Sequence, residues 1–308
     1  MTTLVIGVDG GGSKTRALVA DSEGTVLGAA DGPASAIRPG QEERSANVIA
    51  DTVRSALGLV EVEEPTLRVL CAGVAGAGRA APRDALARAL ETHGLAEEVI
   101  VQPDAAVALE DAFGDGPGIL LVAGTGSIAF GRGPAGNESR CGGWGPVCGD
   151  EGSGAWLGRR ALSVVTAAID GREPDTALVG AVLTAAQTDD PTDLIAWAAA
   201  ATPGELAALA PVVVAVADQG DRRANALLAL ACEELALHVR TLSRVLFTDE
   251  RAAVPVALGG GLLAPGALLR KRVEQRLKSA VPGAILRAEE VKPERGAVRA
   301  ALRALATA

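Results

Sequence analysis

The sequence predicts an α/β protein built from two domains that share one order of elements. Its 308 residues are enough for two domains of the usual ~150 residues. Two segments, beginning near Leu4 and Gly118, each open with a short apolar run, a glycine-rich turn and a second apolar run. In both halves, segments of helical periodicity then alternate with short apolar runs. Together these observations indicate a duplicated fold.

Three short strands are predicted to open the N-terminal half. Tight turns separate the apolar runs, as in an antiparallel meander; the runs are 4–9, 15–20 and 25–29. Strands and helices then alternate, with strands at 67–74 and 99–101 and helices at 42–57, 82–93 and 105–113. Pro82 suits the first turn of its helix. This order is typical of a ribonuclease-H-like domain, which we expect over residues 1–115.

The C-terminal half repeats this beginning. Strands at 118–123 and 128–131 flank a glycine turn, and a glycine-rich segment, 141–154, precedes a helix that ends near Ile169. Residues 175–250 have helical patterning throughout, and a strand at 254–258 and helices at 265–278 and 293–305 follow. We expect a second ribonuclease-H-like domain over 116–290 with a helical insertion. Residues 291–308 are expected to form a helix that packs back on the N-terminal domain, and the ligand is expected between the halves.

Composition excludes several classes of function. Lys and Arg number 29 against 38 Asp and Glu, so a broad surface for nucleic acid or anionic lipid is not expected. No run of about 18 apolar residues predicts a membrane span, and the start MTTLVIGVDGGG has no basic segment of a signal peptide. We therefore expect a cytoplasmic protein with no membrane partner. Its four cysteines and two histidines show no zinc spacing or hydrolase pattern; they are Cys71, Cys141, Cys148, Cys232, His93 and His238.

The first glycine turn, DGGGSKT at 9–15, has the composition of a phosphate-binding loop. Three successive glycines let backbone N–H groups face an anion with no side chain in the way. The three residues after them add two hydroxyls and one positive charge, and Asp9 suits a hydrated Mg²⁺ beside phosphates. The turn is not a P-loop, because Ser13 separates the last glycine from Lys14. The simpler alternative is a plain hairpin turn.

Two further glycine turns follow apolar runs. GTGS at 124–127 again carries hydroxyls, and GGG at 259–261 leads towards a helix whose N-terminus would add positive potential. The segment 76–81 also fits the G-x-G-x-x-A pattern of dinucleotide-binding proteins. That pattern normally opens a repeated strand–helix–strand sheet, whereas this chain opens with a meander. Phosphate binding by the turns is therefore favoured over an NAD-type enzyme.

Acidic residues occur at two places of interest: after the predicted strand at 99–101, and within the glycine-rich segment 141–154. Asp104 lies between a strand and a helix, where it can cap the helix or accept a hydroxyl proton. Asp150 and Glu151 precede another helix, where carboxylates stabilise the helix dipole. Trp144 lies in CGGWG, either as a buried anchor or as the wall of a sugar site. These positions are the candidates for chemistry.

The motifs resemble those of the N-acetylglucosamine kinases. That group also holds the activating ATPases of benzoyl-CoA reductase, and it belongs to the actin, hexokinase and heat-shock ATPase superfamily. The resemblance runs from end to end, through DGGGSKT (9–15), PDAA (103–106), AGTGS (123–127), CGGWG (141–145), GDEGS (149–153) and ALGGG (257–261). CGGWG followed by GDEGS is the most specific pair and indicates the sugar kinase branch. The activating ATPases instead hold an iron–sulfur cluster with cysteines, an arrangement that these four do not fit.

The resemblance implies two actin-like ATPase domains, ATP and Mg²⁺ as cofactors, a homodimer, and transfer of phosphate to the 6-hydroxyl of an amino sugar. Asp104 would be the general base, and Asp9 would hold Mg²⁺ through water. The residues implied for the ATP phosphates are Gly10, Gly11, Gly12, Ser13, Lys14, Thr15, Gly124, Thr125, Gly126 and Ser127. Those implied for adenosine are Gly259, Gly260 and Gly261, and those implied for the sugar are Ser35, Gly143, Trp144, Gly145 and Asp150.

One position departs from the sugar kinase branch. Ala36 lies where that branch carries an Asn that touches the sugar, so Ser35 or Arg38 must replace it or the sugar differs. N-acetylglucosamine and glucosamine are the substrates expected. Two alternatives remain open at this point: an ATPase that activates a protein partner without phosphorylating a sugar, and a sugar-sensing module without catalysis.

Overall fold

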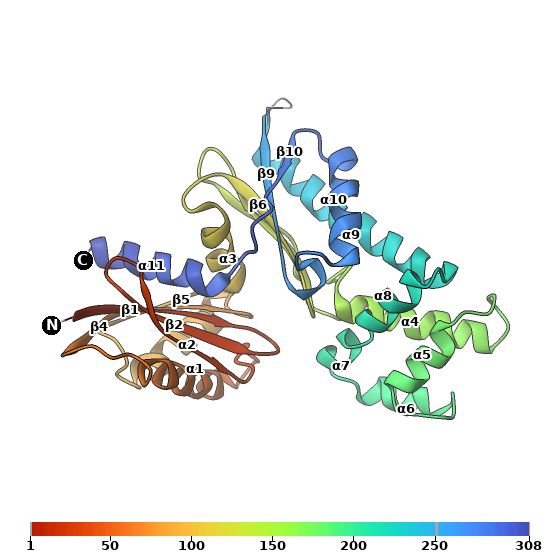
Figure 1. The fold of residues 1–308 in the computed structure, drawn as a ribbon, viewed down its shortest axis with the longest axis horizontal. Coiled ribbons are helices and arrows are strands. Elements are labelled where there is room, and N and C mark those ends of the chain that lie inside the picture. The colour runs from red at the N-terminus through yellow and green to blue at the C-terminus, as the bar shows by residue number, and fades with distance from the viewer. Residues whose placement is uncertain (1, 250–251, 308) are drawn as a thin grey trace. The chain divides into compact units, whose positions relative to one another are not determined.

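Two five-stranded sheets form the framework of the protein, which confirms the α/β class (Figure 1). The computed structural model describes residues 2–249 and 252–307. The chain divides into unit 1, made of Met1–Gly116 and Val291–Ala308, and unit 2, made of Pro117–Glu290. Each sheet has two antiparallel and two parallel pairings in the same sequence, so the two units share one topology.

The sheet of unit 1 has the order β3-β2-β1-β4-β5. Its strands are β1 (Thr2–Gly10), β2 (Thr15–Asp21), β3 (Val26–Gly32), β4 (Pro65–Val74) and β5 (Glu98–Pro103). The first three form the expected antiparallel meander, and β4 and β5 are parallel to β1. Crossover helices connect the parallel strands, as such pairings require.

Helices cover both faces of this sheet. On one face lie α1 (Glu42–Leu57) and α2 (Ala80–Glu91); on the other lie α3 (Asp104–Phe113) and α11 (Pro293–Thr307) (Figure 1). Alternate side chains of β1 enter different cores: Leu4, Ile6 and Val8 pack on the α1 side, and Val5 packs on the α11 side. A strand buried on both faces must be apolar throughout, which explains the unbroken run at the start of the chain.

Helix α11 is attached to unit 1 through Asp111 of α3, whose side chain is only 2% exposed. The Asp111 carboxylate accepts hydrogen bonds from the Lys292 backbone N–H at 2.7 Å and from Arg295 at 2.9 Å. Arg299 lies 3.6 Å from its other oxygen and donates to the Asp111 carbonyl at 2.9 Å. A buried carboxylate with these partners holds the beginning of α11 against α3.

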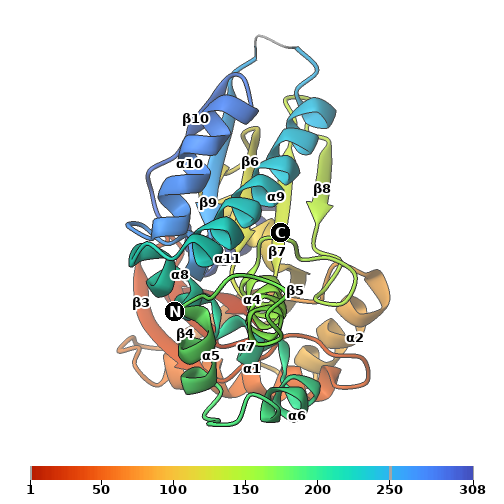
Figure 2. The same ribbon diagram turned by 90° about the vertical axis from the view of Figure 1, so that its right-hand side faces the viewer.

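The sheet of unit 2 has the order β10-β9-β6-β7-β8. Its strands are β6 (Gly118–Ala123), β7 (Ser127–Arg132), β8 (Glu138–Gly142), β9 (Val254–Gly259) and β10 (Ala284–Leu286). The helices are α4 (Gly154–Ile169), α5 (Leu178–Ala185), α6 (Asp193–Ala200), α7 (Pro203–Ala207), α8 (Ala210–Asp218), α9 (Arg222–Leu246) and α10 (Leu268–Ala280). Figure 2 shows α9 lying along the strands, and it contacts β6, β7 and β8. Within 2–249 and 252–307, no single helix is long and apolar enough to cross a membrane.

The structure of unit 2 adds two details to the sequence prediction. Strand β8 was not predicted, because ESRCG has no apolar run; it forms by pairing with β7 at the edge of the sheet. The helix predicted over 265–278 is α10, which begins at Leu268, and a three-residue 3₁₀ turn, Gly261–Leu263, lies between it and β9.

Asp111→Ala tests the attachment of α11. Removing this carboxylate takes the acceptor from the Lys292 N–H and deletes the ion pairs with Arg295 and Arg299, so we expect a loss of about 3 kcal/mol in the free energy of opening of this helix. Amide hydrogen exchange over α11 and α3 measures that loss. The matched control is Asp51→Ala, whose exposed pair with Arg54 is worth under about 1 kcal/mol. Equal protection of α11 in both variants would contradict the role of Asp111.

Candidate functional site

In unit 1, three strand ends meet at one edge of the sheet. Gly10 of β1 is paired with Val74 of β4, and Val74 is paired with Pro103 of β5. The first glycine turn therefore begins at the same level of the sheet at which Asp104 follows β5. Neighbouring strands lie about 4.8 Å apart, so Asp104 and the glycine turn are about two strand spacings from each other. This edge is the candidate site of unit 1.

The first glycine turn leaves backbone donors unused. A hydrogen bond from the Gly11 N–H to the Lys14 carbonyl, 2.9 Å, closes the turn. Gly12, Ser13 and Lys14 are exposed, and no hydrogen bond within the described residues uses the N–H groups of Gly12 and Ser13. Two free N–H groups beside a lysine form a suitable cradle for an anion.

The hydroxyl of Thr15 is used inside the fold. It is fully buried and lies 2.5 Å from the Pro33 carbonyl and 2.7 Å from Ser35 Oγ. Ser35 is 2% exposed, and its N–H and that of Ala36 donate to the Gly11 carbonyl. The segment after β3 is thus hydrogen-bonded to the glycine turn. Of the hydroxyls predicted for this turn, only that of Ser13 is exposed.

Two carboxylates, those of Asp104 and Glu294, act on a third, that of Asp9, at this edge. Burial and the negative charges of Asp104 and Glu294 raise the pKa of Asp9 to about 7, against a smaller lowering by Lys14. Burial also raises the pKa of Asp104, although the N–H of Ala105 donates to its carboxylate at 2.9 Å. Asp104 is the first residue of α3, and Pro103 holds the capping position, so Asp104 does not cap the helix.

Glu294 was not identified from the sequence. It lies in the first turn of α11, and its carboxylate is 3.5 Å from Arg16 Nε of β2, which also pairs with Asp31. The only sequence signal for it is the Pro-Glu pair that opens the last predicted helix. Its position follows from how α11 packs on β1, which no local pattern specifies.

The Asp9 carboxylate fits a hydrated divalent cation. No hydrogen bond within residues 2–249 and 252–307 reaches it, and burial together with the charges of Asp104 and Glu294 raises its pKa and disfavours its charged form. The positive charge of a cation would offset this effect. In the part of the chain that the structure describes, no three Asp, Glu, His or Cys side chains gather closely enough to ligate a metal directly.

In unit 2, the second and third glycine turns lie against each other. Gly260 has φ of +84°, and a Cβ there would collide with the Ala123 carbonyl at the end of β6. The second turn closes with a bond from the Gly124 N–H to the Gly126 carbonyl, 2.9 Å. Within the described chain, the N–H groups of Thr125 and Gly126 make no hydrogen bond. This turn also offers an anion two free donors.

The segment that follows β8 is folded onto the second glycine turn. A Cβ at Gly126 would lie 2.7 Å from Asp150 Oδ2, so only glycine fits beside this carboxylate. Asp150 is 6% exposed, has φ of +59°, and accepts a hydrogen bond from the Gly145 N–H at 3.1 Å. The buried hydroxyl of Ser127 donates to the Glu151 carbonyl at 2.7 Å. A left-handed, buried aspartate is a strained feature typical of a functional site.

Trp144 is not a buried anchor. Its side chain is 67% exposed, and the guanidinium of Arg140 lies over its ring, 4.4 Å from the centroid. Arg140 also donates to the Gly142 carbonyl at 2.6 Å. This cation–π contact fixes the orientation of the indole ring, six residues before Asp150 in the chain. Gly143 and Gly145, with φ of +69° and +88°, place it there.

His238 of α9 contacts the same segment through Glu151 and Gly142. The residue is 7% exposed, and its Nε2 lies 3.7 Å from Glu151 Oε2. Its ring lies against Gly142, where a Cβ would be 3.1 Å from it. Burial lowers the pKa of His238, against smaller opposite effects of Glu151, Glu234 and Asp150. No local pattern in the sequence connects this histidine to Glu151, which lies 87 positions earlier in the chain.

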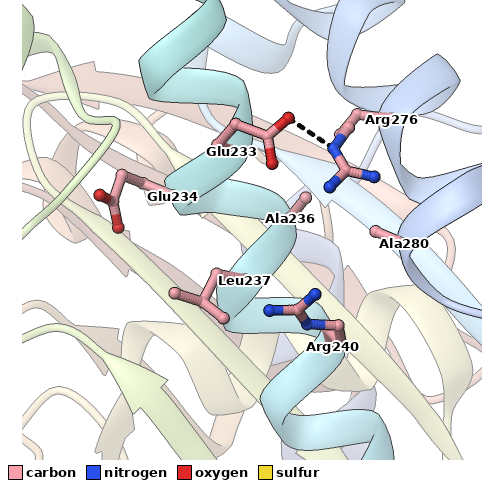
Figure 3. A pocket seen from close by; sticks show the side chains of 7 residues that line it. All are labelled: Glu233, Glu234, Ala236, Leu237, Arg240, Arg276 and Ala280. Atoms are coloured by element: carbon pink, nitrogen blue, oxygen red, sulfur yellow. Dashed lines mark hydrogen bonds and ion pairs between the residues drawn. The ribbon is translucent and has the colours of Figure 1, made fainter.

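Two hollows lie apart from these residues. One, of about 120 Å³, lies between α9 and α10, where Glu233 and Arg276 pair at 2.6 Å (Figure 3). None of the residues implied by the resemblance lines it. The other, of about 280 Å³, lies in unit 1 between the segments that follow β3 and β4. Its lining begins at Ile37, immediately beyond Ser35 and Ala36.

A family model describing the BadF/BadG/BcrA/BcrD ATPase family matches residues 6–302 of the chain. The chain is 32% identical over 258 residues to an N-acetylmuramic acid/N-acetylglucosamine kinase of Clostridium acetobutylicum, covering 83% of this chain and 84% of that protein. It is 28% identical over 312 residues to an N-acetyl-D-glucosamine kinase of Dictyostelium discoideum, covering 97% and 98%. Both relatives match more than four fifths of the chain.

The fold has a similarly extensive match among solved structures. A crystal structure from Chromobacterium violaceum, of a candidate N-acetylglucosamine kinase, has a TM-score of 0.80 and 32% identity and covers 96% of this chain and 98% of that one. The expected fold of two related α/β domains is thereby confirmed.

The lowered pKa of His238 makes a prediction about stability. The unfolded imidazole binds a proton near pH 6.5, whereas the folded one does so only at lower pH. Between these values the unfolded state holds more protons, so the histidine reduces stability as pH falls below about 6.5. We expect the wild type to lose stability relative to His238→Gln as pH falls from 7 to 5.

Tryptophan fluorescence in urea measures this effect, because Trp144, Trp156 and Trp197 all lie in unit 2. His93→Gln, in unit 1, is the matched control for the loss of one histidine. A constant difference between wild type and His238→Gln across this pH range would show that His238 is not titrating as described.

Proposed function

The chain belongs to the BadF/BadG/BcrA/BcrD ATPase family, and we propose that it is an ATP-dependent kinase that phosphorylates the 6-hydroxyl of an amino sugar. N-acetylglucosamine and glucosamine are the substrates that we propose first. The observation that carries the proposal is the position of Asp104 at the carboxyl edge of the sheet, level with a glycine turn that has free backbone donors.

Asp104 is proposed as the general base. Its pKa is raised by burial, which makes its carboxylate a stronger proton acceptor than an ordinary aspartate. Within the described residues, only backbone N–H groups at the start of α3 donate to it, so an oxygen remains free to accept a proton. In the proposed step, the sugar 6-hydroxyl attacks the γ-phosphorus, its proton passes to Asp104, and ADP leaves.

The glycine turns are proposed to hold the nucleotide. The free N–H groups of Gly12 and Ser13, with Lys14, would bind phosphate oxygens, as would those of Thr125 and Gly126. Asp9 would hold Mg²⁺ through water, and the metal would supply positive charge to the phosphates. The turn at 259–261, which lies against the second turn, is proposed for adenosine. Thr15 and Ser127 would support these turns through their buried hydroxyls.

The segment 143–150 is proposed to bind the sugar. Asp150 has one carboxylate oxygen held by Gly145, and its position beside Gly126 would keep it close to the transferring phosphate. The exposed face of Trp144 offers a flat apolar surface of the kind on which sugar rings pack. Ser35 would contribute from the segment after β3. The single proton of Thr15 goes to the Pro33 carbonyl, so Ser35 donates to Thr15 Oγ1 and its own oxygen is left to accept a hydrogen bond.

Asp104→Asn tests the base. A positioned general base is worth ~10²–10⁴-fold in rate, so turnover should fall by that factor while sugar binding survives. Coupled measurement of ADP release gives the turnover number, and calorimetry gives the dissociation constant for the sugar. Asp84→Asn on the exposed side of α2 is the matched control. Retention of more than about a third of wild-type turnover would exclude Asp104 as the base.

A sugar panel separates the kinase from its main alternative, an ATPase that activates a protein partner. ADP release is measured with Mg-ATP and each of N-acetylglucosamine, glucosamine, N-acetylmannosamine, glucose and no sugar. We expect an amino sugar to raise the rate at least ~100-fold, which is about 2.7 kcal/mol of barrier. A steady rate that no sugar changes would favour the partner-activating ATPase.

A further inference from the structure

Arg16 of β2 has three carboxylates within its reach. The pairing of β1 with β2 places it directly opposite Asp9, and the pairing of β2 with β3 places it directly opposite Asp31. Residues paired in this way lie on the same face of a sheet, with their Cβ atoms about 5 Å apart. Glu294, in the first turn of α11, is the third carboxylate. The backbone therefore allows Arg16 to pair with any of the three.

Arg16 pairs with only two of these carboxylates. Its Nη1 donates to Asp31 Oδ2 at 3.2 Å, and its Nε lies 3.5 Å from Glu294 Oε1. Within residues 2–249 and 252–307, Asp9 makes no ion pair and accepts no hydrogen bond. The carboxylate that the sheet places opposite the arginine is thus the one that the arginine does not bind.

Glu294 is the more firmly placed of the two partners. Its side chain is 12% exposed, whereas that of Asp31 is 59% exposed. A Cβ at Gly7, two residues before Asp9, would lie 2.6 Å from the Glu294 carbonyl, so glycine here lets the first turn of α11 lie directly on β1. Arg16 Nε is buried and makes no hydrogen bond in the described chain. Because an exposed ion pair contributes little, Glu294 is the partner that holds the guanidinium.

We propose that Glu294 is a positioning residue that holds Arg16 away from Asp9 and so keeps the Asp9 carboxylate free for the hydrated Mg²⁺. The inference rests on the proposed function, in which Asp9 holds that cation through water. An arginine bound to Asp9 would occupy the oxygens that the hydrated cation needs, and its charge would repel the cation. Arg16 and Glu294 contact neither the sugar nor the reacting phosphate in this scheme, and both act through Asp9.

Binding of a non-hydrolysable ATP analogue tests the inference without catalysis. Calorimetry gives its dissociation constant in EDTA and in excess Mg²⁺, and the ratio of the first to the second is the contribution of the cation. In Glu294→Gln, Arg16 is free to pair with Asp9, so this ratio should fall at least ~10-fold from the wild-type value. In Arg16→Gln and in Arg16→Gln/Glu294→Gln, no guanidinium competes for Asp9. The ratio should then stay above about half of the wild-type value.

A second variant and a control accompany this measurement. Asp31→Asn removes the exposed partner of Arg16 without touching α11, and it should lower the ratio ~2–5-fold, again only when Arg16 is present. The matched control is Glu97→Gln in the same unit, which removes an exposed ion pair with Arg68 of 2.9 Å. It should leave the ratio unchanged.

The outcomes separate this inference from the proposed function. An equal fall of the ratio in Glu294→Gln and in Arg16→Gln/Glu294→Gln would overturn the inference, because Glu294 would then act on the cation directly. An unchanged ratio in Glu294→Gln would also overturn it. If Asp9→Asn binds the analogue as the wild type does in Mg²⁺ and in EDTA, Asp9 holds no cation, and the inference fails with that part of the proposed function. A sugar that stimulates ADP release would still support the kinase.

Discussion

The pairing of parallel strands with the first strand of each unit determines where the chemistry-bearing residues lie. In unit 1, the register Gly10–Val74–Pro103 places a glycine turn, the Ala75 segment and Asp104 at one edge. In unit 2, the pairing of Val122 with Gly259 brings the second and third glycine turns together. A shift of one residue in either register would turn the strand side chains to the opposite faces and separate these turns.

The candidate site of unit 1 buries carboxylates close to one another, which disfavours their charged forms when no ligand is bound. Asp9, Asp104 and Glu294 share one edge, and the pKa of Asp9 rises to about 7 as a result. Such an arrangement reduces the stability of the folded chain, and a bound cation would offset that cost. In unit 2, Asp150 is likewise a buried acid, held at positive φ beside the glycine turn at 124–127. Both units hold buried acids whose pKa is raised by burial next to free backbone donors.

Local patterns predicted most of the framework and part of the site. Apolar runs and helical periodicity identified the meander of unit 1, its three following helices and the first two strands of unit 2. They missed β8, whose polar sequence becomes a strand only through pairing with β7. They also identified the three glycine turns but not which hydroxyls stay free: those of Thr15 and Ser127 are buried and hydrogen-bonded. Hydrogen-bond partners far apart in the chain cannot be found from local composition.

The sequence by itself determined the α/β class, the glycine turns and the identities of Asp9, Asp104 and Asp150, because these depend on residue type and short-range spacing. The tertiary structure alone decided which of these groups meet. It placed Glu294 of the last helix near Asp9 through Arg16, and His238 of α9 beside Glu151. It also formed the hollow between the segments after β3 and β4. Those contacts arise from packing between residues 40 to about 280 positions apart, and packing is a property of the whole fold rather than of any segment.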